Sequence, residues 1–219
     1  MATSDEAKRG VGRPPDAELR ENRKRQILEA ATRVFAKHGF GSAADVQEIA
    51  DLVGIGKGTV YRYFPSKEEL FLATVDHGIR RLKASVDEAV AAIDPADTSP
   101  LAPMAVGVRA YLRFFDENPE VTELLIHERA HFRDRAQPTY YVHREANIKP
   151  WQDLFRHLIE TGVIRNVPVE RTLDYVSDML YGSMFTNYFS GRKTRLSDQS
   201  ATILDLLFNG LLVERNWDQ

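Results

Sequence analysis

An all-α fold is predicted by three features of the 219-residue sequence. Apolar residues recur every three or four positions, the spacing of one face of an α-helix. No run alternates apolar and polar residues over a useful length, so no strand is predicted. Proline and glycine interrupt the apolar pattern where helices would end. These features predict nine helices, divided between an N-terminal unit at 21–67 and a C-terminal domain at 68–219.

The first predicted helix follows a polar N-terminal stretch. Residues 1–20 contain GVGRPP and are expected to form a flexible basic arm. The segment RKRQILEAATRVFAKHG carries one apolar stripe, and Gly39 supplies the C-terminal stop. The members of this stripe are Ile27, Leu28, Ala31, Val34 and Phe35.

Two short helices and a long one are predicted next. Asp45 is expected to cap the first, which ends by Leu52 or Val53 ahead of a glycine, and Glu48 completes a capping box. The second short helix runs from residue 57 to about residue 64, where Pro65 closes it. Ser66 then caps a long helix that continues to about residue 93.

Five further helices are predicted in the C-terminal domain. Each break falls at a proline or glycine, residues that end helices for steric or conformational reasons. The predicted ranges are 101–116, 119–133, 138–162, 169–190 and 198–215.

Composition excludes several classes of site. The sequence has no cysteine, so disulfides, thiolate metal sites and cysteine nucleophiles are excluded. No stretch is apolar enough for a signal peptide or membrane span, which predicts a cytoplasmic protein with no membrane partner. The net charge is −3, but residues 1–67 hold twelve Lys/Arg against nine Asp/Glu, while residues 68–219 hold seventeen against twenty-three. The local basic excess is a modest electrostatic footprint for phosphate.

The stretch GIGKGTVYRYFPSK, residues 54–67, is rich in hydrogen-bond donors. Two short helices joined by a glycine turn match the helix-turn-helix, whose second helix enters the DNA major groove. Gly56 and Gly58 would let the backbone approach a phosphate. Val60 and Phe64 are expected to face inward, leaving the polar side chains outward. The alternative is that Tyr61, Tyr63 and Phe64 are core aromatics and Lys67 a solvated charge.

Residues 25–75 resemble the DNA-binding domain of the TetR/AcrR family of bacterial transcriptional repressors. The resemblance is carried by IADLVGIGKGTVYRYFPSKEELF, which is close to a family pattern GxxKGTxYxxFxSKExL. It implies an N-terminal helix-turn-helix joined to an all-α ligand-binding and dimerisation domain. It also implies a repressor that binds a palindromic double-stranded DNA operator as a homodimer and is released by a small-molecule effector.

The resemblance also implies roles for individual residues. Lys57, Tyr61 and Lys67 would contact phosphate, near the backbone at Gly58. Thr59, Arg62 and Tyr63 would lie at or near base edges, and Gln47 would read a base. Arg62 and Gln47 have the chemistry to recognise guanine and adenine, although a phosphate contact is equally open for Arg62.

The arm carries a second, weaker pattern. KRGVGRPP resembles the Gly-Arg-Pro core of AT-hook segments, in which an arginine lies in the narrow minor groove. This resemblance implies a minor-groove contact for Arg13. A solubilising tail is the alternative interpretation.

Two C-terminal helices are more apolar than a monomer requires. The helix at 169–190 is apolar on nearly every face, and the last helix has a similar surplus. A symmetric partner would cover the surplus, with Gly182 and Gly210 allowing close approach. A homodimer would also present two recognition helices about 34 Å apart, which matches successive major grooves.

The motif HERAH, residues 127–131, satisfies the zinc-protease pattern H-E-x-x-H. His127 and His131 would share a helix face with Glu128 as the base, so a zinc-dependent hydrolase is an alternative function. No third ligand follows at a familiar spacing. We therefore predict no enzyme activity, no metal and no cofactor, and interpret these histidines as surface or pocket residues.

An effector pocket is expected between helices of the C-terminal domain. Aromatic and methionine side chains suit a flat or apolar molecule. A filled core, in a regulator without a small ligand, is the alternative. The candidate lining residues are Tyr111, Phe115, His127, His131, Tyr141, Trp151, Phe155, Tyr175, Met179 and Phe185.

Overall fold

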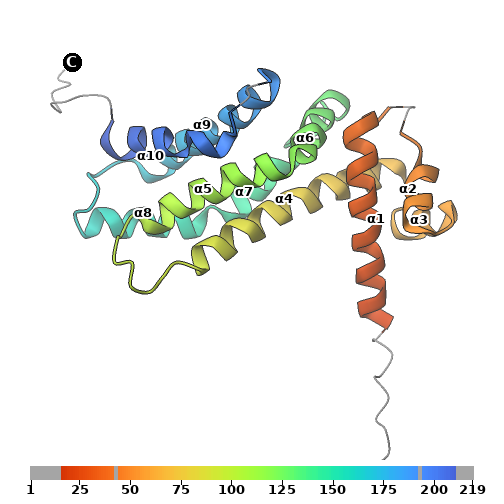
Figure 1. Ribbon diagram of the computed structural model, residues 1–219, viewed down its shortest axis with the longest axis horizontal. Coiled ribbons are helices and arrows are strands. Elements are labelled where there is room, and N and C mark those ends of the chain that lie inside the picture. The colour runs from red at the N-terminus through yellow and green to blue at the C-terminus, as the bar shows by residue number, and fades with distance from the viewer. Residues whose placement is uncertain (1–15, 42–43, 192–193, 211–219) are drawn as a thin grey trace, which may run out of the picture.

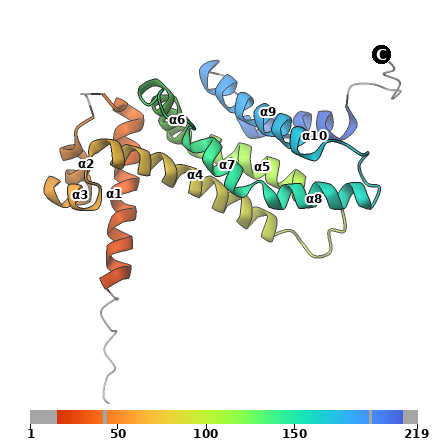
Figure 2. The ribbon, with the colours of Figure 1, turned by 180° about the vertical axis from the view of Figure 1, so that it is seen from behind.

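The computed structural model describes residues 16–41, 44–191 and 194–210. Within these ranges the chain forms ten α-helices and one short 3-10 helix, with no strand, which confirms the all-α prediction. Figures 1 and 2 show α1 (Asp16–His38) crossing the start of α4 (Lys67–Ala91), with α2 (Val46–Val53) and α3 (Lys57–Tyr63) beside it. From there α4 runs into the C-terminal helices. This long helix therefore joins the two parts of the molecule.

The first helix begins earlier than predicted. Residues 16–20 belong to α1, so the expectation of a flexible arm through residue 20 is wrong for these five positions. The sequence DAELR explains the difference, because acidic side chains in a first turn complement the helix dipole and Ala, Glu, Leu and Arg favour helix. The flexible arm predicted for residues 1–15, which includes Arg13, lies outside the described residues.

The two short helices form close to the predicted bounds, but the capping box expected from Glu48 is wrong, because this side chain lies 3.6 Å from His38. Asp45 accepts a hydrogen bond from the Gln47 backbone amide at 2.8 Å, which caps α2. Gly54 ends α2 with a φ of 69°, a left-handed conformation that favours glycine. Val60 and Phe64 are buried in the main hydrophobic core. The apolar side of α3 is thus fixed inward and its polar side is left for solvent.

The C-terminal domain contains one more α-helix than predicted and also a short 3-10 helix. Its elements are α5 (Ala102–Glu117), α6 (Pro119–His131), α7 (Thr139–Asn147), α8 (Lys149–Glu160), α9 (Val169–Phe189), the 3-10 helix η1 (Leu196–Gln199) and α10 (Ser200–Asn209). The single helix predicted over 138–162 is wrong, because the chain breaks at Ile148. Pro150 has no amide hydrogen to donate and its ring disfavours a continuous helix. Because of this break, α7 and α8 are two separate helices.

The last predicted helix also differs from the structure. In place of one helix over 198–215, η1 leads into α10, which ends at Asn209. Gly210 follows with a φ of 71°, which ends the helical conformation. No helix in the described part of the chain is both long and apolar enough to cross a bilayer.

One hydrophobic core extends through both parts of the molecule. It contains buried side chains of α1 to α4 together with others from α5, α6, α9 and α10. At its centre Phe71 of α4 is fully buried, with ring-centroid distances of 5.1 Å to Phe35, 5.3 Å to Phe40 and 5.4 Å to Phe132. Phe132 follows α6. This aromatic cluster therefore joins the three-helix unit, formed by α1, α2 and α3, to the C-terminal domain.

Candidate functional site

The outward face of α3 is polar and accessible. Tyr61 and Arg62 are exposed, while Lys57, Thr59 and Tyr63 are partly exposed. At Gly58, an added Cβ atom would meet nothing within 4 Å. The start of this helix is therefore open to a close approach by another molecule, as an anion at a helix N-terminus requires.

Two of the side chains predicted to bind DNA, one on α3 and one on α2, already have partners within the protein. Lys57 Nζ lies 2.9 Å from Asp45 Oδ1. The hydrogen bond to Asp45 raises the pKa of Lys57, while the hydrogen bond from the Gln47 amide and then that from Lys57 lower the pKa of Asp45. Gln47 Nε2 donates to Asp51 Oδ1 at 2.7 Å. A ligand that binds Lys57 or Gln47 must compete with a carboxylate for it.

Lys67 and Arg62 are held differently. Lys67 Nζ donates to the Gly41 carbonyl at 2.6 Å and lies 5.3 Å from the centre of the Phe40 ring. Desolvation lowers the pKa of Lys67. The Arg62 guanidinium carbon lies 6.0 Å from the centre of the Tyr63 ring, with no hydrogen bond or ion pair among the described residues. Arg62 therefore keeps its planar set of donors free for an incoming group.

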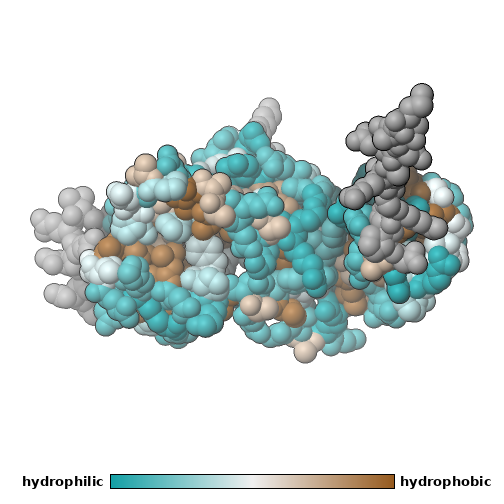
Figure 3. Space-filling view, turned by 90° about the horizontal axis from the view of Figure 1, so that it is seen from below, coloured by the Kyte–Doolittle hydropathy of each residue, from teal (hydrophilic) through white to brown (hydrophobic). Residues whose placement is uncertain are grey.

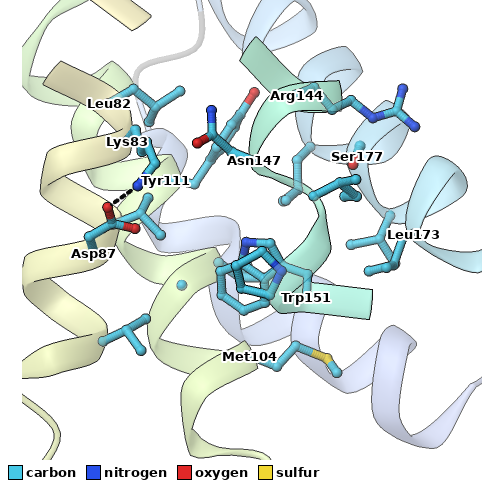
Figure 4. Close-up of a pocket in the computed structure, with 18 of the residues that line it drawn as sticks. Leu82, Lys83, Asp87, Met104, Tyr111, Arg144, Asn147, Trp151, Leu173 and Ser177 are labelled. Carbon is cyan, nitrogen blue, oxygen red and sulfur yellow. Dashed lines mark hydrogen bonds and ion pairs between the residues drawn. The ribbon is translucent and has the colours of Figure 1, made fainter. Parts of the chain in front are cut away.

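A cavity of about 630 Å³ lies in the C-terminal domain, with walls from α4, α5, α7, α8 and α9 (Figure 4). Its deeper wall includes buried Met104, Val108 and Leu173, and its rim includes the exposed ion pair Lys83–Asp87. Figure 3 shows apolar surface over the C-terminal domain, interrupted by polar side chains. The size and largely apolar lining are typical of small-molecule sites.

Comparison with known proteins identifies the three-helix unit. The family model described as bacterial regulatory proteins, tetR family, matches residues 27–74, which run from α1 into α4. These residues form a TetR-family helix-turn-helix domain. An uncharacterised HTH-type transcriptional regulator, YhgD of Bacillus subtilis, is 41% identical over 69 residues, covering 32% of this chain and 36% of the relative. The repressor KstR of Mycobacterium tuberculosis is 28% identical over 109 residues, 50% and 47% of the two chains.

Solved structures share the fold over a greater length. The fatty acid degradation regulator FadR of Bacillus halodurans superposes with a TM-score of 0.71 at 18% identity, covering 86% of this chain and 99% of that one. FadR of Bacillus subtilis, in complex with stearoyl-CoA, gives 0.69 at 18% identity over the same shares. By sequence, however, this chain spans only about a third to a half of the length of the curated relatives named above.

The cavity lining contains three of the ten ligand residues predicted from sequence, namely Tyr111, Trp151 and Phe155. Phe115 is buried against Tyr111, and Tyr175 is 67% exposed on α9. The other predicted residues that lie outside the lining are His127, His131, Tyr141, Met179 and Phe185. Tyr140, His143, Arg144 and Asn147 were missed, although Pro150 was a signal for the break that places them there.

The HERAH segment, at the end of α6, has a structural role. Glu128 is only 2% exposed, and its Oε1 accepts from the Thr139 amide at 2.9 Å, the Thr139 hydroxyl at 2.7 Å and Arg135. His131 Nδ1 lies 3.0 Å from the His127 carbonyl oxygen. Glu128 thus points into the protein and is not placed to act as a base beside the histidines. No group of three potential metal ligands occurs among the described residues.

Proposed function

We propose that this TetR-family protein is a transcriptional repressor that binds a palindromic operator as a homodimer and releases it when a small apolar effector enters the cavity. The observation that carries the proposal is α3, which holds Val60 and Phe64 in the core and presents Tyr61 and Arg62 to solvent. This is the arrangement that a recognition helix requires. The family match over residues 27–74 supports the same interpretation.

Exposed apolar side chains on the last two helices support a homodimer. Tyr175 and Phe189 on α9 are 67% and 68% exposed, and Leu206 on α10 is also exposed. Gly182, between them on α9, leaves open space around its backbone. A second copy of the chain would cover these side chains in a symmetric, self-complementary contact. Two copies would also supply the paired recognition helices that a palindrome needs.

The presence of a cavity favours a regulator that binds a ligand over the alternative, a regulator with a filled core and no ligand. Its volume and apolar walls suit an elongated apolar molecule, and the similarly folded FadR of Bacillus subtilis binds stearoyl-CoA. We infer that a molecule with a long acyl or alkyl chain is the effector.

The long helix α4 is the proposed connection between ligand and DNA. Phe71 anchors one part of α4 in the shared core, and Leu82 farther along lines the cavity. Between them Asp76 accepts a hydrogen bond of 2.7 Å from His143, which also lines the cavity. A ligand that shifts α7 would therefore act directly on α4. A coupling of roughly 1–3 kcal/mol would change DNA affinity about 5- to 150-fold.

The DNA-binding proposal is tested by two substitutions on the same surface. Arg62→Ala is expected to cost roughly 1–3 kcal/mol at one operator position, because one base contact is lost. Lys67→Ala is expected to weaken binding to all DNA and lower the salt slope by about one. Both effects are measured by fluorescence anisotropy at several salt concentrations. One duplex carries the DNA upstream of the protein's own gene, and the other carries a scrambled sequence. Equal losses on both duplexes for Arg62→Ala would make Arg62 a phosphate contact.

Asp45 is expected to restrain binding to DNA of any sequence. Asp45→Asn keeps an effective N-cap on α2 but removes the charge that holds Lys57. Affinity for the scrambled duplex should rise several-fold and its salt slope should steepen by about one, because one more cation reaches phosphate. The control is Asp94→Asn, since Asp94 caps a turn before α5. An unchanged salt slope for Asp45→Asn would show that Asp45 does not hold Lys57 away from phosphate.

A further inference from the structure

Two tyrosine hydroxyl groups meet in the wall of the cavity. Tyr111 comes from α5 and Tyr140 from α7, and their oxygen atoms lie 3.2 Å apart. The two residues are only 9% and 7% exposed, yet both line the cavity. The two hydroxyl groups therefore place a polar group in the mainly apolar lining of the cavity.

The two hydroxyl groups carry one more proton than the hydrogen bond between them requires. Two hydroxyls carry two protons, and whichever oxygen donates, the hydrogen bond between them uses one. Among the described residues neither hydroxyl has another hydrogen-bond partner. Desolvation raises the pKa of Tyr111 well above its ordinary value and that of Tyr140 to about 12, so both protons are retained at neutral pH. One donor therefore remains for a ligand.

The surroundings favour an uncharged acceptor over a carboxylate. The Lys and Arg side chains in the lining already have carboxylate partners. Arg144 on α7 is paired with Asp174 and lies 3.9 Å from Asp178, and Lys83 on α4 is paired with Asp87. A carboxylate beside the tyrosines would have no uncommitted positive partner, and burying such a charge is costly. A carbonyl oxygen would accept the spare proton without adding charge.

The shape of the cavity separates the two hydroxyl groups from an apolar end. In Figure 4, Tyr111, Asn147 and Arg144 lie toward one end, Met104 lies toward the other, and Trp151 lies between them. Phe155 and Leu173, both buried, add to the apolar lining. A ligand with its oxygen on the tyrosines would direct its hydrocarbon chain past Trp151.

We propose that the cavity selects an elongated apolar molecule with one neutral oxygen acceptor, such as the carbonyl of a ketone, ester or thioester, bound by the Tyr111–Tyr140 hydroxyl pair. This selectivity rests on the proposed effector function and specifies its ligand class. The hydroxyl pair supplies the discrimination, and the apolar walls supply most of the binding energy.

The test compares two probes of the same shape. The first is 2-nonanone, and the second is 2-methyl-1-nonene, in which a CH2 group replaces the carbonyl oxygen. Trp151 lies in the cavity wall, and Trp217→Phe leaves it as the single tryptophan, so its fluorescence reports binding of each probe. The ratio of the two dissociation constants is measured in this background and again with Tyr111→Phe and Tyr140→Phe together.

The double substitution is expected to reduce the relative preference for the ketone roughly 3- to 10-fold, the effect of one neutral hydrogen bond. Removing both hydroxyls leaves no unpaired partner behind, so the fold should persist. Tyr175→Phe, an exposed position outside the lining, should leave the ratio unchanged. An unchanged ratio in the double variant, with both probes bound, would overturn the tyrosine inference alone. Failure of both probes to bind would overturn the proposed ligand site itself.

Discussion

Replacing Phe71 with alanine is expected to lower the free energy of unfolding by about 3–5 kcal/mol, the largest effect anticipated for a single substitution here. The ring is completely buried and makes edge-to-face or stacked contacts with Phe35, Phe40 and Phe132. Alanine would leave a cavity at the junction of α1, α4 and the end of α6 and remove these aromatic contacts. For a chain of this size, the midpoint of thermal unfolding should fall by roughly 6–20 °C.

Leu52→Ala is the matched control for Phe71→Ala. Leu52 is also apolar and lies in the three-helix unit, but it is 53% exposed. Its substitution should change stability by no more than about 0.5 kcal/mol. Denaturant and thermal unfolding should be compared at one protein concentration, because a dimer's apparent stability depends on concentration. Equal losses for the two variants would contradict a shared core centred on Phe71.

Replacing Glu128 with alanine is expected to cost about 2–4 kcal/mol of stability. Its carboxylate accepts hydrogen bonds from the Thr139 amide, the Thr139 hydroxyl and the Arg135 guanidinium. These contacts fix the connection between α6 and α7. Alanine would leave the buried Thr139 amide and hydroxyl without their acceptor. Chemical denaturation at neutral pH measures the loss.

Glu128→Gln separates the acceptor role from the charge. Glutamine keeps an oxygen at the same distance along the side chain, so it should retain more stability than alanine. Because Arg135 is partly exposed, its unpaired charge can be solvated in both variants. If the Glu128→Ala protein were fully stable, the contacts of Glu128 would not be needed for the fold. The alternative role of Glu128, as the base of a hydrolase, would then have to be considered again.

The helix-turn-helix could be predicted closely because its signals are local. Asp45, Gly54 and Pro65 act on their immediate neighbours, and α2 and α3 lie within about a residue of the predicted bounds. The inward positions of Val60 and Phe64 followed from their spacing of four residues.

The cavity could not be predicted to the same degree because it depends on distant contacts. Tyr111 and Tyr140 meet only after α5 and α7 have both packed against α4, and a continuous helix over 138–162 would have placed α7 differently. The aromatic character of Tyr175 and Phe185 made both candidates for the lining, but it did not indicate that both would lie outside the cavity, with Tyr175 67% exposed. HERAH was ambiguous for a related reason, since Thr139, the partner that commits Glu128 to the interior, lies eleven residues farther along the chain.

The most direct test of DNA recognition by paired copies of α3 is footprinting on the chain's own upstream DNA, with the mass of the protein–DNA complex measured on the same fragment. We predict two protected half-sites related by a palindrome, with centres about 10 base pairs apart or a multiple of that spacing, and an even number of protein chains on each duplex. Absence of protection at low salt, or a complex that contains a single chain, would contradict the account.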